Sequence, residues 1–395
     1  MNNEIFNLDE QYIMHTYKRF NVCFTHGNGA FLYDESGKEY VDFGSGIGVN
    51  CLGHNNAAWV SAIEEQLHKL AHISNLYYNE QAPKLAKMLC EKTGMNNVFF
   101  GNSGAEANEG AIKIARKYSF MKYGADAGRN KIISIKNSFH GRTLTTLSAT
   151  GQDVFHNFFF PFTEGFVFAD KEIDAIENAI DEQVCAIMFE VIQGEGGILP
   201  LQQEFVDFLV KTAAEKDLLL IVDEIQTGVG RTGKFLASEH YNFKPDIVTL
   251  AKGLAGGMPI GAVLCNEKTK DVFTYSDHGS TFGGNPLSCA AAIAVLEQID
   301  GKFLDNVLEK GEYLRKKLME ELGGDIVEIR GKGLMLGVDL KDLAAGAVIA
   351  KAIDKGAVIL SAKNSLRFLP PLVISKEQID KGVSALRAAV EEIKE

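Results

Sequence analysis

Two short apolar runs in the middle of the chain each end on a residue that could do chemistry. Residues 218–222 are followed by Asp223 and residues 247–251 by Lys252. Runs of this length, rich in β-branched residues and bounded by polar ones, are typical of central strands in a parallel sheet. Ligands of open α/β sheets bind outside the carboxyl ends of such strands. We therefore expect a carboxylate and an amine at one sheet edge.

These two residue types suit a heterocyclic aldehyde ligand. An ionised Asp223 can hold a proton on a ring nitrogen, and a lysine removed from water has a lowered pKa, so that its neutral amine attacks a carbonyl carbon. Taken singly, a strand-terminal aspartate is usually a helix cap or a loop residue, and a lysine is usually solvated. Their joint occurrence with an anion-binding loop favours the chemical interpretation.

That loop is the glycine-rich segment 101–107, which follows an apolar run at 98–100 and precedes a strongly helical run. Its glycines allow close backbone approach and Ser103 supplies a hydroxyl. The free N–H groups and about half a unit of positive charge at a helix start attract a phosphate. Ordinary helix capping by Asn102 or Ser103 is the alternative explanation.

A second glycine-rich segment, 228–233, formally matches the G-x-G-x-x-G pattern of dinucleotide-binding proteins. Such a loop follows its strand directly and opens a long helix. Here residues 224–227 intervene, and residues 234–237 begin no amphipathic pattern. A further cluster at 331–333 precedes a strand. The sequence therefore argues against a nicotinamide enzyme.

Size and composition favour a multidomain enzyme that acts on small molecules. The chain has 395 residues, which is longer than a single hydrophobic core usually accommodates. Hydrophobic residues make up 46% of it, as in a globular protein. The net charge of −12 opposes binding to nucleic acid or to anionic membranes. Six scattered cysteines indicate neither a disulfide framework nor a zinc site, and no metal is expected. Without a signal-like start or a long apolar run, we expect a cytoplasmic protein.

The order of the predicted elements indicates an α/β fold with a second, smaller domain. Residues 1–56 read as an N-terminal arm that joins the small domain. Residues 57–285 alternate strands and helices, which specifies a large ligand-binding domain with a mostly parallel central sheet. Residues 286–395 read as a small α+β domain. The predicted strands are 30–33, 39–43, 98–100, 132–135, 186–189, 218–222, 247–251, 326–329, 333–338 and 366–369. The predicted helices are 60–70, 105–118, 204–215, 287–299, 304–322 and 343–354.

Five motifs together resemble the class III, fold-type I, pyridoxal-phosphate aminotransferases over essentially the whole chain. The resemblance implies the fold of that family, pyridoxal 5'-phosphate as cofactor, and a homodimer with shared active sites. One departure is His54-Asn55-Asn56-Ala57, where relatives more often have Gly-His-x-His-Pro, which affects local substrate contacts only. The motifs that carry the resemblance are 101–109, 138–143, 223–228, 250–253 and 278–286.

Within the class, three further segments are similar to the subgroup that acts on N2-acetylornithine. They are 74–78, 193–197 and 367–372. This similarity implies transfer of the δ-amine of N2-acetylornithine to 2-oxoglutarate, a step of arginine biosynthesis.

The resemblance also implies a role for each candidate cofactor residue. Lys252 would bind the cofactor aldehyde covalently and then move the substrate proton. Asp223 would pair with the ring nitrogen, and Gln226 would hydrogen-bond the ring hydroxyl oxygen. The remaining contacts would be Ser103, Gly104 and Ala105 at the phosphate, Phe139 on the ring face, and Thr281 reaching the phosphate from the neighbouring subunit.

Substrate binding is implied for four residues. Arg142 and Arg367 are expected to bind carboxylates, because planar guanidinium groups do so bidentately. Glu195 would pair with Arg367 while a donor without a nearby carboxylate is bound, and would move away for glutamate. Ser280 would lie beside the substrate.

Three alternatives remain open. Other ω-amine donors are succinylornithine, ornithine, 4-aminobutyrate and an N-blocked lysine, although segment 46–48 offers no phenol where ornithine-type enzymes tend to carry a tyrosine. A pyridoxal-phosphate aminomutase or racemase would turn over without a 2-oxo acid. A catalytically inactive α/β binding protein is disfavoured because Lys252, Asp223 and Arg142 are all present.

Overall fold

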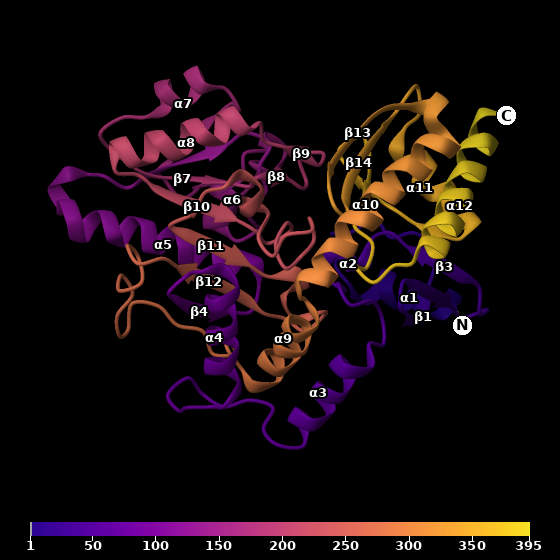
Figure 1. Ribbon diagram of the computed structural model, residues 1–395, viewed down its shortest axis with the longest axis horizontal. Coiled ribbons are helices and arrows are strands. Elements are labelled where there is room, and N and C mark those ends of the chain that lie inside the picture. Colours follow the sequence, from indigo (N-terminus) through magenta and orange to yellow (C-terminus); the bar gives the residue numbers. More distant parts are fainter. Residues whose placement is uncertain (1) are drawn as a thin grey trace.

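A seven-stranded sheet forms the centre of the larger part of the molecule (Figure 1). In the computed structural model, which describes residues 2–395, its strand order is β4-β12-β11-β10-β7-β5-β6. Strands β11 to β6 pair in parallel, whereas β12 is antiparallel to both neighbours. This confirms the predicted mostly parallel sheet. The strands are β4 (Asn97–Gly101), β5 (Lys131–Ile135), β6 (Phe166–Ala169), β7 (Val184–Phe189), β10 (Leu219–Asp223), β11 (Ile247–Leu250) and β12 (Gly261–Cys265).

The central strands are apolar throughout because both faces of the sheet are covered. In β10, Leu220 and Val222 belong to the apolar cluster that includes α8 (Gln203–Lys216), while Leu219 and Ile221 belong to the cluster that includes α5 (Gly104–Tyr123). Successive side chains of a strand point to opposite faces. A strand that is buried on both faces therefore needs a continuous apolar run. A strand with alternating apolar and polar residues would place polar side chains in one of the two cores.

The strand directions bring three loops to one edge of the sheet. Since β12 is antiparallel to both β4 and β11, β4 runs in the same direction as β11 and β10. The segments that follow β4, β10 and β11 therefore leave the sheet at the same edge. Ser103 and Lys252 lie two residues beyond β4 and β11, and Asp223 is the last residue of β10.

The C-terminal residues form a second sheet, β13-β14-β17-β16, which is antiparallel throughout (Figure 1). Helices α10 and α11 pack against its strands, and α12 packs on both helices. The elements are α10 (Gly301–Leu322), β13 (Ile326–Lys332), β14 (Met335–Leu340), α11 (Ala345–Lys355), β16 (Leu360–Ala362), β17 (Ser365–Phe368) and α12 (Lys376–Lys394).

The N-terminal strands join this C-terminal part. Strands β1 (Phe24–Asn28), β2 (Phe31–Asp34) and β3 (Glu39–Asp42) form an antiparallel ribbon, and β15 (Ala357–Val358) pairs with β3 in parallel. The division into 1–56, 57–285 and 286–395 stays a prediction, and Met1 lies outside the described residues. Helix α9 (Pro286–Gln298) contacts α3 (Ala57–Leu67) and α4 (Gln81–Thr93).

Several elements lie outside the predicted set. Helix α12 was missed although Ser375 and Gln378 form a capping box at its start. Strand β12 was missed because its run is short and begins with Gly261. No helix among residues 2–395 is long and apolar enough to cross a membrane. The other helices and strands outside the predicted set are α1 (Asn2–Tyr12), α2 (Ser45–Gly48), α4, α6 (Leu144–Ala149), α7 (Ile173–Ala179), β1, β6, β8 (Ile192–Gln193), β9 (Leu199–Pro200), β15 and β16.

The packing of α12 on the N-terminal ribbon can be tested at Gly382. A Cβ atom there would lie 2.2 Å from Phe43 Cε2 and 3.0 Å from Val41 Cγ1. Gly382→Ala should therefore lower the free energy of unfolding by about 1–3 kcal/mol through overpacking. The control is Gly346→Ala in α11, which has no atom within 4 Å and should be neutral or up to ~1 kcal/mol more stable. Equal denaturant midpoints for the two variants would contradict this packing.

Candidate active site

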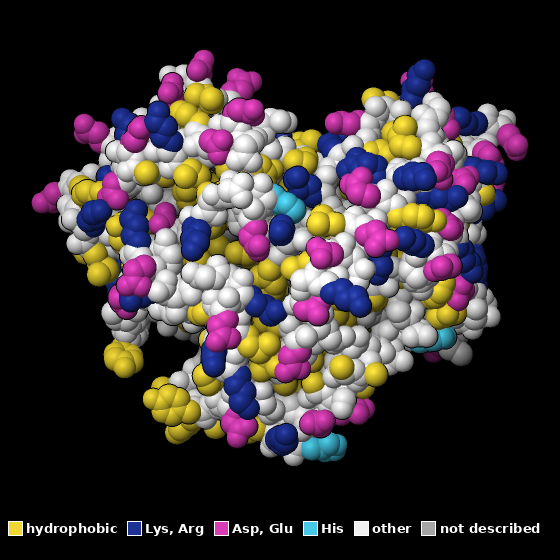
Figure 2. Space-filling model, in the orientation of Figure 1, with side chains coloured by type: hydrophobic (Ala, Val, Ile, Leu, Met, Phe, Trp, Pro, Cys, Tyr) yellow, Lys and Arg dark blue, Asp and Glu magenta, His cyan; other side chains and the backbone are white. Residues whose placement is uncertain are grey.

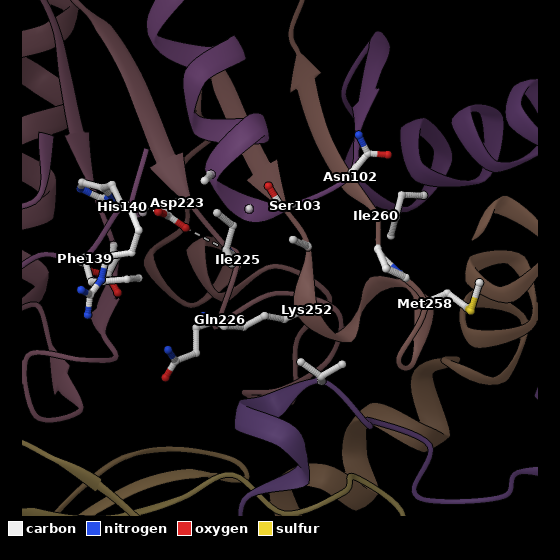
Figure 3. A pocket seen from close by; sticks show the side chains of 18 of the residues that line it. Asn102, Ser103, Phe139, His140, Asp223, Ile225, Gln226, Lys252, Met258 and Ile260 are labelled. Carbon is white, nitrogen blue, oxygen red and sulfur yellow. Dashed lines mark hydrogen bonds and ion pairs between the residues drawn. The ribbon is translucent and has the colours of Figure 1, made fainter. Parts of the chain in front are cut away.

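A cavity of about 400 Å³ lies at the carboxyl edge of the central sheet (Figure 3). Its walls come from the segments that follow β4, β5, β10 and β11. The structure thus gathers residues that are more than a hundred positions apart in the sequence. The predicted residues that line it are Ser103, Gly104, Ala105, Phe139, Arg142, Asp223, Gln226 and Lys252.

Asp223 is a buried carboxylate that is held by three donors. Its Oδ2 atom accepts hydrogen bonds from Asn108 Nδ2 and His140 Nδ1, both at 2.8 Å, and its Oδ1 atom accepts one from the Ile225 amide at 3.0 Å. Figure 3 shows Asp223 beside His140 on one wall of the cavity. A buried charge needs such donors. Asn108 and His140 are not among the predicted site residues, although both lie inside motifs that carry the resemblance.

Lys252 lies two residues after the end of β11 and begins a 3₁₀ turn, Lys252–Ala255. Its backbone has a φ of 41°, a left-handed conformation that is uncommon for a residue with a side chain and is often found at functional sites. Burial lowers the pKa of its amine, with Arg367 acting in the same direction, while the carboxylates of Asp223, Glu195 and Glu190 oppose the shift. The lowered pKa favours the neutral, nucleophilic form.

The loop after β4 combines helix capping with free backbone donors. Ser103 caps α5, since its Oγ atom accepts a hydrogen bond from the Glu106 amide at 3.1 Å. The amides of Gly104 and Ala105 have no acceptor among the described residues. Capping and anion binding are therefore compatible here, because capping uses only part of the donor set at the helix start.

Glu190 is an active-site acid that the sequence analysis missed. It follows β7, is 5% exposed, and lines the cavity. Its carboxylate accepts hydrogen bonds from the amides of Phe139 and Gly194, both at 2.9 Å. Burial raises its pKa to about 7, Asp223 acts in the same direction, and His140 opposes the shift. The sequence signal was present, because an apolar run that ends on an acid is the pattern that marked Asp223.

Glu195 and Arg367 form an ion pair with Oε1 and Nη1 2.5 Å apart. Arg367 lies on β17 and is 4% exposed, whereas Glu195 follows β8 in the larger part of the molecule. Neither residue lines the cavity, but both charges act on the pKa of the Lys252 amine. The Nε atom of Arg367 is buried and has no partner among the described residues.

Arg142 is exposed at the cavity and makes no ion pair with any described carboxylate. Its Cζ atom lies 4.1 Å from the ring centroid of Phe155 and 5.5 Å from that of Phe139. The two aromatic rings contact the face of the guanidinium group, so the N–H groups at its edge are available to donate hydrogen bonds. The residue is thus positioned to bind a carboxylate.

Ser280 and Thr281 line a second cavity, of about 1060 Å³, and do not line the first. The two cavities adjoin at Asn102, whose Nδ2 donates to Ser280 Oγ at 2.9 Å. The role that the resemblance implies for Thr281 involves a neighbouring subunit, so it stays a prediction.

The donors and acceptors of the first cavity fit pyridoxal phosphate. Gln226 Oε1 and His140 Nε2 are buried without partners among the described residues. The free amides at the start of α5 suit its phosphate, the carboxylate of Asp223 suits its ring nitrogen, and the Lys252 amine suits its aldehyde.

Glu190→Gln tests the electrostatics of this cavity in the cofactor-free protein. A carboxyl group whose pKa rises from 4.5 to about 7 on folding binds a proton between those values only in the folded state. Its stability contribution is therefore lost as pH rises from about 4.5 to about 7. The glutamine variant should show a flatter dependence of the unfolding free energy on pH in denaturant titrations. Glu204→Gln, at an exposed acid on α8, is the control, and identical curves for both variants would contradict the assignment.

Two comparisons of sequence identify relatives over nearly the full chain. The family model for aminotransferase class-III matches residues 12–390. The acetylornithine aminotransferase of Haemophilus ducreyi is 48% identical over 393 residues, which cover 99% of both chains. That of Caldanaerobacter subterraneus is 50% identical over 394 residues, covering 98% of this chain and 99% of the relative.

Solved structures agree with this assignment. The ornithine aminotransferase of Toxoplasma gondii has a TM-score of 0.94 at 34% identity, covering 100% of this chain and 96% of that one. The N-acetylornithine aminotransferase of Stenotrophomonas maltophilia has a TM-score of 0.85 at 36% identity, covering 98% and 99%. The fold type expected from the sequence is confirmed, and the chain belongs to the class-III aminotransferases, a family of pyridoxal-phosphate enzymes.

Proposed function

We propose that this enzyme transfers the δ-amine of N2-acetylornithine to pyridoxal phosphate and then to 2-oxoglutarate, forming N-acetylglutamate semialdehyde and glutamate in arginine biosynthesis. The observation that carries the chemistry is that Asp223 and Lys252, at the ends of adjacent parallel strands, line one cavity. The choice of donor is supported by the names of the relatives that are close to half identical over their full length.

Bound pyridoxal phosphate supplies an aldehyde that takes up the amino group and a ring that accepts electrons. Asp223 would hold the proton on its ring nitrogen, fixed in place by Asn108 and His140. Lys252 Nζ would bind the aldehyde carbon and, once displaced by the substrate amine, would take the proton from the substrate carbon that bears that amine. The lowered pKa of Lys252 suits both tasks, because each requires the neutral amine.

The remaining cofactor contacts follow from the free groups of the cavity. The amides of Gly104 and Ala105, with the Ser103 hydroxyl, would hold the phosphate at the start of α5. Gln226 would direct its amide group toward the ring hydroxyl oxygen, and Phe139 would cover a ring face. Each assignment is a proposal about this chain's residues.

One site can serve both substrates because Arg142, which lines the cavity, and Arg367, which is paired with Glu195, differ in availability. The reacting carbon of acetylornithine carries no carboxylate, whereas that of glutamate carries one. Arg367, whose charge acts on Lys252, would bind the latter carboxylate after Glu195 has moved away. Arg142 has no acidic partner among the described residues and would bind the distant carboxylate of either substrate. With acetylornithine bound, Glu195 would keep the buried Arg367 neutralised.

We further propose a homodimer that shares its active sites. Figure 2 shows hydrophobic side chains protruding at the lower left, where Figure 1 shows the α3–α4 and β12–α9 connections. Large exposed apolar patches mark interaction surfaces. The same segments line the second cavity, so a partner seated there would meet Thr281. The exposed side chains of these connections include Leu76, Tyr77, Tyr78, Tyr275 and Phe282.

The cysteines favour a reducing compartment. All six are free, and four of them are buried. We therefore propose the cytoplasm as the site of action, where unpaired thiols persist.

The function is tested by separate half-reactions of the purified enzyme. Acetylornithine should remove the visible absorbance of the bound cofactor's aldehyde form, and 2-oxoglutarate should restore that absorbance. Ornithine should react at least about tenfold more slowly. Lys252→Ala should lose the protein-linked absorbance and turn over several orders of magnitude more slowly. Faster conversion with ornithine would replace the proposed donor, and turnover without any 2-oxo acid would indicate a mutase.

The dimer is tested at Tyr78, which is fully exposed in the single chain. A buried aromatic side chain at an interface contributes strongly to affinity, so Tyr78→Asp should weaken self-association at least about tenfold in analytical ultracentrifugation. Activity should fall with it. Val327→Asp, at an exposed hydrophobic residue of β13 on the other part of the molecule, is the control. A monomeric wild type, or equal dissociation of both variants, would refute the proposed surface.

A further inference from the structure

The Glu195–Arg367 pair joins two parts of the molecule that have no strand in common. Glu195 lies in the loop Gly194-Glu195-Gly196-Gly197, and Arg367 lies in the C-terminal sheet. Three glycines in four residues leave such a loop with high conformational freedom, and Gly197 has a φ of 119°. Its own backbone bonds are long, from the Gly197 and Ile198 amides to the Gly194 oxygen at 3.4 and 3.3 Å, so contacts from outside the loop add to what holds Glu195 at 2.5 Å from Arg367.

Arg330 on β13 contacts both the loop that carries Glu195 and the strand that carries Arg367. Its Nε atom donates to the carbonyl oxygen of Gly197 at 2.8 Å, two residues after Glu195. Its Nη2 atom donates to Ser365 Oγ at 2.7 Å, two residues before Arg367. Side chains two residues apart on a strand share a face, so Ser365 and Arg367 lie on the same face of β17.

The strand register explains how the loop fits between the two arginines. Gly337 on β14 pairs with Arg330 on one side and with Arg367 on the other. A Cβ atom on Gly337 would lie 3.0 Å from the Gly197 oxygen and 2.9 Å from Ile198 Cβ. The absence of a side chain at this position thus opens the space that the loop occupies.

Asp339 fixes the Arg330 guanidinium and neutralises it. Arg330 Nη1 and Nη2 donate to its two carboxylate oxygens at 2.6 and 3.0 Å, and Ser365 Oγ donates to Oδ1 at 2.5 Å. A bidentate fork defines orientation as well as distance. Because Asp339 balances its charge, Arg330 can hold the loop through the Gly197 carbonyl without competing with Arg367 for Glu195.

We propose that Arg330 is a positioning residue for the Glu195–Arg367 pair and thereby sets the preference between donors with and without a carboxylate on the reacting carbon. The inference rests on the proposed function, in which that pair closes for acetylornithine and opens for glutamate. Arg330 touches neither substrate nor cofactor. It acts through the loop that carries Glu195.

The two half-reactions should therefore respond differently to loss of the fork. A freed loop leaves Arg367 unpaired more often, which disfavours a donor that offers it no carboxylate. Glutamate supplies its own carboxylate to Arg367 and does not need Glu195. In Arg330→Lys, which keeps a charge but loses the planar fork, kcat/KM for acetylornithine should fall about tenfold relative to that for glutamate. The change should lie in KM, with the cofactor absorbance unaltered.

The experiment measures both half-reactions by stopped-flow absorbance on the holoenzyme. Ser365→Ala removes the hydroxyl that links Arg330 to β17 and provides a milder second variant, with an expected shift of about threefold. The matched control is Arg315→Lys, because Arg315 donates to the carbonyls of Ile329 and Gly331 on either side of Arg330 but not to the loop. It should leave the substrate ratio within about twofold of wild type.

The outcomes separate this inference from the proposed function. Equal losses in both half-reactions of Arg330→Lys and Ser365→Ala, or the same ratio change in Arg315→Lys, would overturn the positioning role. If wild type rejects acetylornithine but accepts another ω-amine, the proposed donor fails, and the ratio measured with that amine still decides the role of Arg330. A wild type without any transamination would overturn both.

Discussion

The buried carboxylate of Asp223 is the constraint on which the rest of the site depends. A charge in this position is stable only when its oxygens accept hydrogen bonds, because burial of an unpaired carboxylate is strongly unfavourable. Asn108 from α5, His140 from the segment after β5, and the amide of Ile225 supply those bonds. They thereby tie three chain segments together at the sheet edge. The helix that offers its N-terminal amides to the phosphate is thus the helix that steadies the acid.

Strand direction is what turns these segments into one site. Of the two acids that end β10, Asp223 lines the cavity, while Glu224 accepts hydrogen bonds from the amides of Ala237 and Ser238 on a buried turn. The two side chains leave the strand on opposite sides, as the strand period requires. The antiparallel strand β12 then brings β4 into line with the parallel strands, so that Ser103 meets Asp223 and Lys252. If only one of these two pairings of β12 were antiparallel, β4 would run the other way and the helix start would lie at the opposite edge.

The sequence was sufficient for those features that depend on local composition. Buried strands β7, β10 and β11 were recognisable as apolar runs, and the Lys252 and Asp223 positions followed from where the runs ended. Glu190 was missed although it obeys the same rule at the end of β7. The pairing of Glu195 with Arg367 came from family resemblance alone, since nothing local links residues 172 positions apart. The contact of Arg330 with the Glu195 loop depends on cross-strand register with Gly337, which a single sequence does not specify. The role implied for Thr281 involves a neighbouring subunit, so a single chain does not test it.

The distribution of charge explains how an acidic chain can bind anionic ligands. The net charge of −12 is that of the whole chain, whereas several charges in and around the site are paired or neutralised. Glu195 neutralises Arg367, Asp339 neutralises Arg330, and the raised pKa of Glu190 removes a negative charge at neutral pH or below. Among the described residues, Arg142 and the amides that begin α5 have no acidic partner. These are places where a substrate carboxylate and a phosphate would bind, because there the ligand's charge meets positive charge that no described carboxylate neutralises. Pairing is therefore as important to selectivity as the presence of arginine, since it decides which guanidinium is available at each step.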